Sequence, residues 1–222
     1  MKKQILLTAV TLCSIHSHVF AQGNVLGPNN LIYAGQMIGG TFMVATEGTP
    51  IGNANMFPLD RKPAFAIDGN LFTWSRNFGE TNTGFIVVPD FNRSGGGTRL
   101  TQLTLATASD APERDPLTFT LEGTNGDPLT GAYQLIVAGS TGFAVDPGRH
   151  TSTLSSSFPA VGSFLSYRLI FPTVRDPTLA DSMQIGEIGL RGVAGPEPSV
   201  LCLLGISVIG LMGARRKRLG TV

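Results

Sequence analysis

The segment "LTFTLEGT" (residues 117–124) alternates apolar and polar side chains along most of its length. Three apolar side chains fall on one face and three polar ones on the other: Leu117, Phe119 and Leu121 against Thr118, Thr120 and Glu122. Because successive side chains of a β-strand point to opposite faces, this pattern predicts a strand with one buried face. It favours a chain built around sheets.

Other short apolar segments surround this one, and turn dipeptides such as Asn125-Gly126 and Pro147-Gly148 lie between them. The segments span 41–47, 84–91, 99–109, 133–139, 164–174 and 183–192. No long stretch has convincing helical periodicity. The pattern predicts an all-β fold of about seven or eight strands, a β-sandwich or jelly roll, with binding residues on its long loops.

The beginning of the chain has the three parts of a secretory signal peptide. Lys2 and Lys3 precede an apolar run that ends near Cys13, and Ala21 ends a Val-Phe-Ala cleavage sequence. The alternative is a buried first helix, but "SIHSH" (14–18) interrupts the apolar face that such a helix would need. We therefore expect residues 1–21 to be a leader that is removed on export.

The end of the chain combines an apolar run with a basic cluster. The run extends from Ser199 to Ala214 and is followed by Arg215, Arg216, Lys217 and Arg218. About sixteen residues with a rise of about 1.5 Å each give a helix of roughly 24 Å, slightly short of a bilayer core of roughly 30 Å. The pattern predicts a single transmembrane helix with its basic end in the cytoplasm. The alternative, a buried core helix, does not suit four terminal charges.

Between these ends lies a body of residues 22–194, which excludes several kinds of site. It contains no cysteine, so disulfides, thiolate zinc sites and a cysteine nucleophile are excluded. Its one histidine is His150, which excludes a histidine-rich metal site. Ten basic residues stand against fourteen acidic ones, a net charge of −4. Without a basic cluster, the body is not expected to bind nucleic acid.

Two stretches of the body, "KPAFAIDGNLFTWSRN" (62–77) and "MQIGEIGLRG" (183–192), together resemble a known family. They are similar to the opening and closing segments of discoidin (coagulation factor 5/8 type C) domains and family 32 carbohydrate-binding modules. The matching positions are Ala66, Asp68, Gly69, Asn70, Thr73, Trp74, Glu187, Ile188, Leu190 and Gly192. The resemblance covers roughly residues 40–193 and implies a galactose-binding-like jelly-roll β-sandwich for residues 22–194.

The same resemblance implies a structural Ca²⁺ site. Asp68 and Glu187 would supply carboxylates, Asn70 a backbone carbonyl and Thr73 its hydroxyl, which are hard oxygen ligands of the kind that calcium prefers. Gly69 is free to adopt the positive φ that a tight Asp-Gly-Asn turn requires. The alternative is that Asp68 caps a turn and Glu187 pairs with an arginine.

Ligand-contacting residues are not fixed by any motif, because in the resembling family they vary among the loops at one end of the sandwich. Candidates by residue type are Arg114, Asp115, Tyr133, His150 and Phe78. Arg114 and Asp115 are adjacent, and a local ion pair between them is an equal alternative. The only tryptophan, Trp74, is interpreted as a loop anchor in preference to a platform for a sugar ring.

The end of the chain resembles the PEP-CTERM sorting signal. Three features occur in order: Pro196-Glu197-Pro198, the short apolar run, and the basic cluster from Arg215 to Arg218. The resemblance implies that residues 195–222 are processed by a membrane enzyme, an exosortase. The protein would be anchored at its C-terminus at least transiently, and then reside at the cell surface or in the extracellular matrix.

These observations favour an exported, non-enzymatic protein that binds carbohydrate or exopolysaccharide. Neither a GxSxG nor an HExxH motif occurs in the sequence. Two alternatives stay open. One is a purely structural matrix protein whose Thr-, Ser- and Gly-rich surface packs against like subunits. The other is a polysaccharide hydrolase that uses scattered carboxylates.

Overall fold

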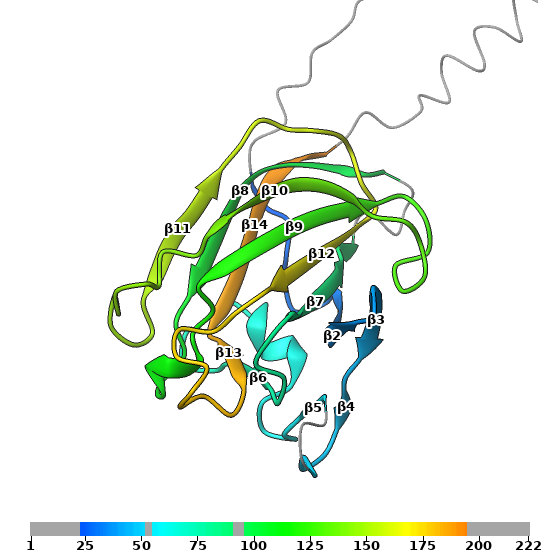
Figure 1. Ribbon diagram of the computed structural model, residues 1–222. Helices are drawn as coiled ribbons and strands as arrows, with labels where there is room; N and C mark the ends of the chain where they lie inside the picture. The colour runs from blue at the N-terminus through cyan, green and yellow to red at the C-terminus, as the bar shows by residue number, and fades with distance from the viewer. Residues whose placement is uncertain (1–22, 52–54, 91–95, 195–222) are drawn as a thin grey trace, which may run out of the picture.

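The chain folds into two antiparallel sheets that face each other (Figure 1). The computed structural model describes residues 23–51, 55–90 and 96–194. The four-stranded sheet has the order β1 (Gly23–Asn24), β14 (Glu187–Ala194), β8 (Thr98–Ala106), β11 (Ser152–Ser157). The six-stranded sheet has the order β10 (Gln134–Ser140), β9 (Thr118–Thr124), β12 (Ser166–Phe171), β7 (Thr83–Val88), β2 (Leu31–Ile38), β3 (Thr41–Val44).

Shorter elements complete the fold. Two two-stranded sheets pair β13 (Met183–Ile185) with β6 (Ser75–Asn77) and β4 (Thr46–Glu47) with β5 (Met56–Phe57). The helical elements of the described residues are short 3-10 turns, among them η1 (Pro63–Ala66) and η3 (Pro112–Arg114). The all-β sandwich expected from the sequence is therefore confirmed.

The core lies between the two large sheets and follows the alternation of the strands. In β9, Phe119 and Leu121 are buried, while Thr118 is exposed and Thr120 and Glu122 are half-buried. The facing sheet contributes Leu103 and Leu105 from β8 and Ile188 and Leu190 from β14 to the same cluster. This period of two is what places one face of each strand in the core.

Two predicted strands are divided in the structure. The segment 183–192 becomes β13 and β14, which are separated by Gly186. A Cβ atom at Gly186 would collide with the carbonyl oxygen of Thr107, so the close approach of the two backbones requires glycine there. The segment 41–47 becomes β3 and β4, with the buried Ala45 between them.

Five strands of the described residues were not predicted: the short β1, β5 and β6, and the longer β2 and β11. β11 is "STLSSS", too poor in apolar residues to show a strand pattern, and it takes its place by pairing with β8. β2 is "LIYAGQMI", whose Gly35 lies opposite Gly84 of β7. Its apolar residues fall on both faces, so the segment lacks clean alternation.

Four loops gather at one end of the sandwich, which we call the loop end (Figure 1). They are residues 67–74, 107–117, 141–151 and 172–182. β14 begins at this end with Glu187 and runs for eight residues to the opposite end, where it is paired with β1 and with the start of β8. The described chain therefore begins and ends away from the loop end.

The predicted leader and sorting segment lie outside the described residues. Within the part of the chain that the structure describes, no helix is long and apolar enough to cross a membrane.

Candidate functional site

The Asp-Gly-Asn sequence forms a tight loop after η1. Gly69 has a φ of +77°, as the turn was expected to require. The backbone N–H of Asn70 donates to Asp68 Oδ1 at 2.9 Å, and the N–H of Phe72 donates to Asn70 Oδ1 at 3.0 Å. These local bonds to short polar side chains hold the loop without regular secondary structure.

The hydroxyl of Thr73 lies at the centre of an oxygen cluster. Its Oγ1 is 2.8 Å from Asp68 Oδ2, 3.0 Å from Asp68 Oδ1 and 2.8 Å from the carbonyl oxygen of Asn70. A hydroxyl has one proton to donate, so it satisfies one of these three acceptors at a time. The backbone N–H groups of Asn70 and Thr73 donate to Asp68 Oδ1 and to the Asn70 carbonyl, so each acceptor of the cluster has a donor.

Glu187 joins this loop from the far end of the sequence. It is the first residue of β14, and its Oε1 accepts a hydrogen bond of 3.2 Å from the backbone N–H of Gly69. Its Oε2 is buried and has no hydrogen-bond partner among the described residues. Burial raises the pKa of Glu187 to about 7, and the charge of Asp68 acts in the same direction, while the Gly69 bond partly offsets both.

The structure thus brings Asp68, Asn70 and Thr73 together, and it places Glu187 against the same loop. The alternative to a metal site expected Asp68 to cap the turn, which it does by accepting the N–H of Asn70. It also expected Glu187 to pair with an arginine, whereas Glu187 accepts the N–H of Gly69. Among the described residues, no three His, Cys, Asp or Glu side chains form a metal-binding group. A cation here would rely on two carboxylates supplemented by neutral oxygens, and this assignment stays a prediction.

A second cluster of charges ties the loops of the loop end together. Asp115 has no exposed surface and lies 2.6 Å from Arg149 and 3.3 Å from Arg175. Asp146 pairs with the same two arginines, at 2.5 and 3.9 Å. Burial raises the pKa of Asp115, whereas the two arginines act in the opposite direction. These contacts connect the loops 107–117, 141–151 and 172–182.

The loop end also presents an aromatic side chain that the sequence interpretation missed. Phe72 is 75% exposed, and its ring centroid lies 5.1 Å from that of His150. His150, which has a positive φ of 54°, contacts the carbonyl oxygen of Leu71 through Nδ1. The imidazole therefore holds the tip of the Asp-Gly-Asn loop from the side. A phenylalanine within a loop of Gly, Asn and Thr is the one sequence signal that points to it.

The other predicted ligand residues do not meet at one place. Arg114 pairs with Asp181 at 2.8 Å, and Asp115 pairs with the arginines described above, so each has a partner other than its neighbour. Tyr133 donates to the carbonyl of Pro128 at 2.7 Å and carries Arg168 over its ring. Their roles in ligand binding, with that of His150, stay predictions.

Two further aromatic rings are covered by arginines. Arg76 lies 4.7 Å from the centre of the Phe78 ring, and Arg61 lies 3.7 Å from that of Trp74. One face of the indole is therefore in contact with a guanidinium, an arrangement that anchors the loop. The role of Phe78 as a ligand contact also stays a prediction.

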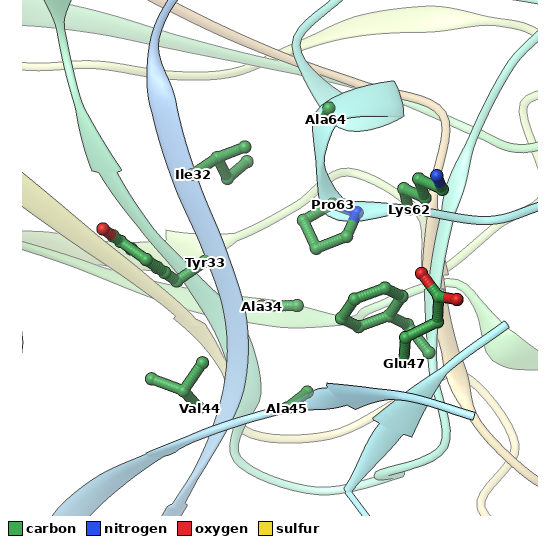
Figure 2. A pocket seen from close by; sticks show the side chains of 10 residues that line it. Ile32, Tyr33, Ala34, Val44, Ala45, Glu47, Lys62, Pro63 and Ala64 are labelled. Carbon is green, nitrogen blue, oxygen red and sulfur yellow. The ribbon is translucent and has the colours of Figure 1, made fainter. Parts of the chain in front are cut away.

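Two hollows in the described residues are lined by residues other than Phe72. A polar hollow of about 160 Å³ adjoins Gly69 and Glu187 on the four-stranded sheet and extends to Arg191. A larger apolar pocket of about 320 Å³ lies between β2, the β3–β4 segment and η1 (Figure 2). In Figure 2, Ile32, Ala34 and Pro63 line one part of it, and Lys62 and Glu47 lie at its side. None of the predicted site residues lines the apolar pocket.

Comparisons with known proteins identify the two parts of the chain separately. The family model of the PEP-CTERM protein-sorting motif matches residues 196–218, which implies an exported protein. No curated protein matches the chain.

Solved structures resemble the body. A family 32 carbohydrate-binding module of NanJ from C. perfringens, solved with galactose, has a TM-score of 0.50 and 10% identity over 77% of this chain and 98% of its own. The module CpGH89CBM32-5 from Clostridium perfringens, solved with GalNAc-β-1,3-galactose, has a TM-score of 0.50 and 13% identity over 76% and 99%. The chain therefore carries a PEP-CTERM protein-sorting motif behind a β-sandwich with the galactose-binding-like fold of family 32 carbohydrate-binding modules and discoidin-like domains.

Proposed function

We propose that this protein is exported and binds carbohydrate through the loop end of its sandwich. The observation that carries the proposal is the pairing of Phe72 with His150 at the tip of the Asp-Gly-Asn loop. The exposed ring of Phe72, held on a braced loop, offers a flat apolar face against which the C–H face of a sugar ring would stack. The fold supports this proposal, since the two modules named above were solved with galactose and GalNAc-β-1,3-galactose.

Loops fixed by ion pairs suit such recognition. The contacts of Asp115 with Arg149 and Arg175 hold three loops of the loop end in place before any ligand arrives. Pre-organised loops lose little conformational entropy on binding, which favours affinity on a small contact area. The polar side chains around Phe72 supply the hydrogen bonds that orient sugar hydroxyls.

A structural Ca²⁺ is part of the proposal. Three observations support it: the convergence of oxygens from Asp68, Asn70 and Thr73, the unpartnered Oε2 of Glu187, and the burial of that carboxyl. Asp68, Asn70, Thr73 and Glu187 would hold the ion, whose charge would neutralise the two carboxylates. The ion would tie the Asp-Gly-Asn loop to β14, and so position Phe72.

The sorting motif supplies the route. We infer that an exosortase-type enzyme processes the motif, which follows β14 after one residue, Gly195. The loop end lies opposite the end of β14, so it would face away from the membrane while the chain is anchored. We infer that the body acts without catalysis, in a surface or matrix role, because the proposed site combines an exposed aromatic ring with loops held by ion pairs.

A glycan array tests the proposal. The body, residues 22–194, contains the whole core from Leu26 to Leu190 and is expected to fold alone. We expect selective retention on galactose-type or exopolysaccharide glycans, and loss of retention in Phe72→Ala. Equal binding of Phe72→Ala would contradict the loop-end site. No retention on any glycan would favour the structural matrix protein, and turnover of a polysaccharide that one carboxylate substitution abolishes would favour the hydrolase.

A further inference from the structure

The six-stranded sheet ends in a strand that is paired on one side. β3 is the last strand of this sheet, and its pairing with β2 runs without a register shift from Gly35↔Val44 to Ile38↔Thr41. A strand edge alternates N–H and C=O groups, so it is complementary to a copy of itself related by a two-fold axis.

β3 is short, with four residues, but its edge lacks the other features that normally prevent such pairing. Natural edges carry charges, prolines or bulges, or are very short. The other edge strands of the two large sheets have such features. The pairings of β10 and β11 both contain register shifts, and β1 has only two residues. By contrast, no Asp, Glu, Lys or Arg occurs from Gly23 to Thr46, and no proline occurs from Leu31 to Thr46.

The absence of charge bears on the identity of the partner. Two-fold pairing places a strand opposite itself, so each charged residue near the axis would face its own copy. A neutral edge avoids this repulsion between copies. It also carries no opposite charge that would attract a charged partner. A second copy of this chain is therefore the partner that the edge fits best.

Exposed apolar side chains are frequent in the stretch of chain that contains this edge. Half of the twelve exposed large hydrophobic side chains in the described residues fall between Leu31 and Leu59: Leu31, Ile38, Met43, Val44, Ile51 and Leu59. The apolar pocket of Figure 2 opens beside them and is lined by Val44 and Ala45. Covering these groups on association would be favourable at roughly 25 cal/mol per Å² of apolar surface.

The hairpin formed by β2 and β3 is fixed by side-chain contacts, which prepares its edge for docking. The side-chain amide of Asn77 donates to Asn55 Oδ1 at 2.6 Å and to the Gly35 carbonyl at 3.3 Å, and Asn55 Nδ2 donates to the Met43 carbonyl at 2.7 Å. Phe42 packs over Gly35, where a Cβ atom would collide with its ring. A fixed edge loses little entropy when it pairs.

We propose that the edge formed by β2 and β3 is a self-association surface, through which two copies of this chain pair β3 to β3 in antiparallel fashion. The pairing extends one sheet through both copies. Its consequence for glycans rests on the proposed function: a dimer presents two loop ends, so one dimer binds two points of a polysaccharide network with increased avidity.

Sedimentation equilibrium of the body without glycan tests the pairing independently of sugar binding. We expect a monomer–dimer equilibrium that Met43→Lys weakens by at least about tenfold, because a lysine on each copy introduces like charges at the axis. Leu135→Lys is the matched control, since Leu135 is equally exposed on the opposite edge strand β10. Thermal melts verify that both variants fold.

Disulfide trapping gives a second, positional readout. The body lacks cysteine, so single substitutions Thr41→Cys, Met43→Cys and Val44→Cys report on β3 alone. We expect an inter-copy disulfide from at least one of them and none from Leu135→Cys. A monomer at every concentration, or trapping only through Leu135→Cys, would overturn the proposal.

The competing occupant of this edge is the sorting segment, residues 195–222. Its native cysteine, Cys202, allows a test of whether the segment lies on the edge. In the chain that retains the sorting segment, an intramolecular disulfide between Met43→Cys and Cys202 would show that the tail covers this edge. That result would also overturn the proposal. A monomeric unaltered body that is retained on glycans would count against the self-association alone, and a dimeric body that is retained on no glycan would count against the proposed function alone.

Discussion

The backbone N–H of Gly69 donates a 3.2 Å hydrogen bond to Oε1 of Glu187, a residue 118 positions later in the chain. This bond joins the Asp-Gly-Asn loop to the first residue of β14. It leaves Oε2 of the same carboxyl buried without a partner among the described residues. A bound cation would satisfy this oxygen and connect the two segments more strongly than one hydrogen bond does.

Removal of calcium is therefore expected to destabilise the body. Ca²⁺ binds the folded state and not the unfolded chain, so it stabilises the protein by mass action. We expect the Tm of the body to fall when EGTA is added and to recover with excess Ca²⁺. Glu187→Gln should make the Tm insensitive to both. An unchanged Tm in EGTA, with no metal found by elemental analysis, would remove the ion from the proposal.

The metal-free body is expected to lose stability as the pH rises. The pKa of Glu187 is about 7 in the folded state against an ordinary value of 4.5, so the folded state retains a proton that the unfolded chain has released. The contribution of this proton to the free energy of unfolding is complete below pH 4.5 and is lost as the pH rises through about 7. The full shift corresponds to roughly 3 kcal/mol, and partial exposure to solvent reduces this to about 1–2 kcal/mol.

Urea unfolding in EGTA at pH 5 and pH 8 measures this effect, and Glu187→Gln is the reference because it cannot titrate. The difference between the two proteins should shrink from pH 8 to pH 5. With Ca²⁺ present the dependence should reverse, since the ion binds the deprotonated carboxylate. A pH-independent difference in EGTA would show that the carboxyl of Glu187 has its ordinary pKa.

The sequence predicted those features that depend on local pattern. Alternation in 117–124 identified β9, and the Asp-Gly-Asn turn identified the positive φ of Gly69. It did not predict β11, whose serine-rich segment is a strand only because β8 lies beside it. It missed Phe72 for the same reason, since the position of this ring depends on His150, 78 residues later. Long-range contacts of this kind leave no local periodicity.

Among the charged residues of the loop end, Asp115 is the one whose substitution is expected to cost the most stability, because its carboxylate is buried. Asp115→Asn would leave Arg149 and Arg175 with only the partly exposed Asp146 as a shared counter-ion. Breaking a buried pair in this way costs about 3–5 kcal/mol. Urea unfolding measures the loss, and Glu113→Gln in the same loop is the control, for which we expect little change. A cost similar to that of the control would show that the arginines find other partners.

Substitution of Phe72 is expected to weaken glycan binding without lowering the stability of the body. Its ring is 75% exposed, so Phe72→Ala removes little buried surface and should leave the Tm nearly unchanged. If a sugar ring stacks on it, the same substitution should weaken glycan binding by at least about tenfold, the loss expected of an aromatic anchor. Val145→Ala is the matched control, because Val145 is 81% exposed at the same end of the sandwich.

Isothermal titration of both variants with the glycan retained by the unaltered body gives the comparison. An equal loss of affinity in Phe72→Ala and Val145→Ala would point to a diffuse apolar contact, whereas a loss confined to Phe72→Ala assigns the ring as the platform. His150→Ala distinguishes positioning from contact: if the imidazole only holds the loop through the Leu71 carbonyl, affinity falls while glycan selectivity is retained.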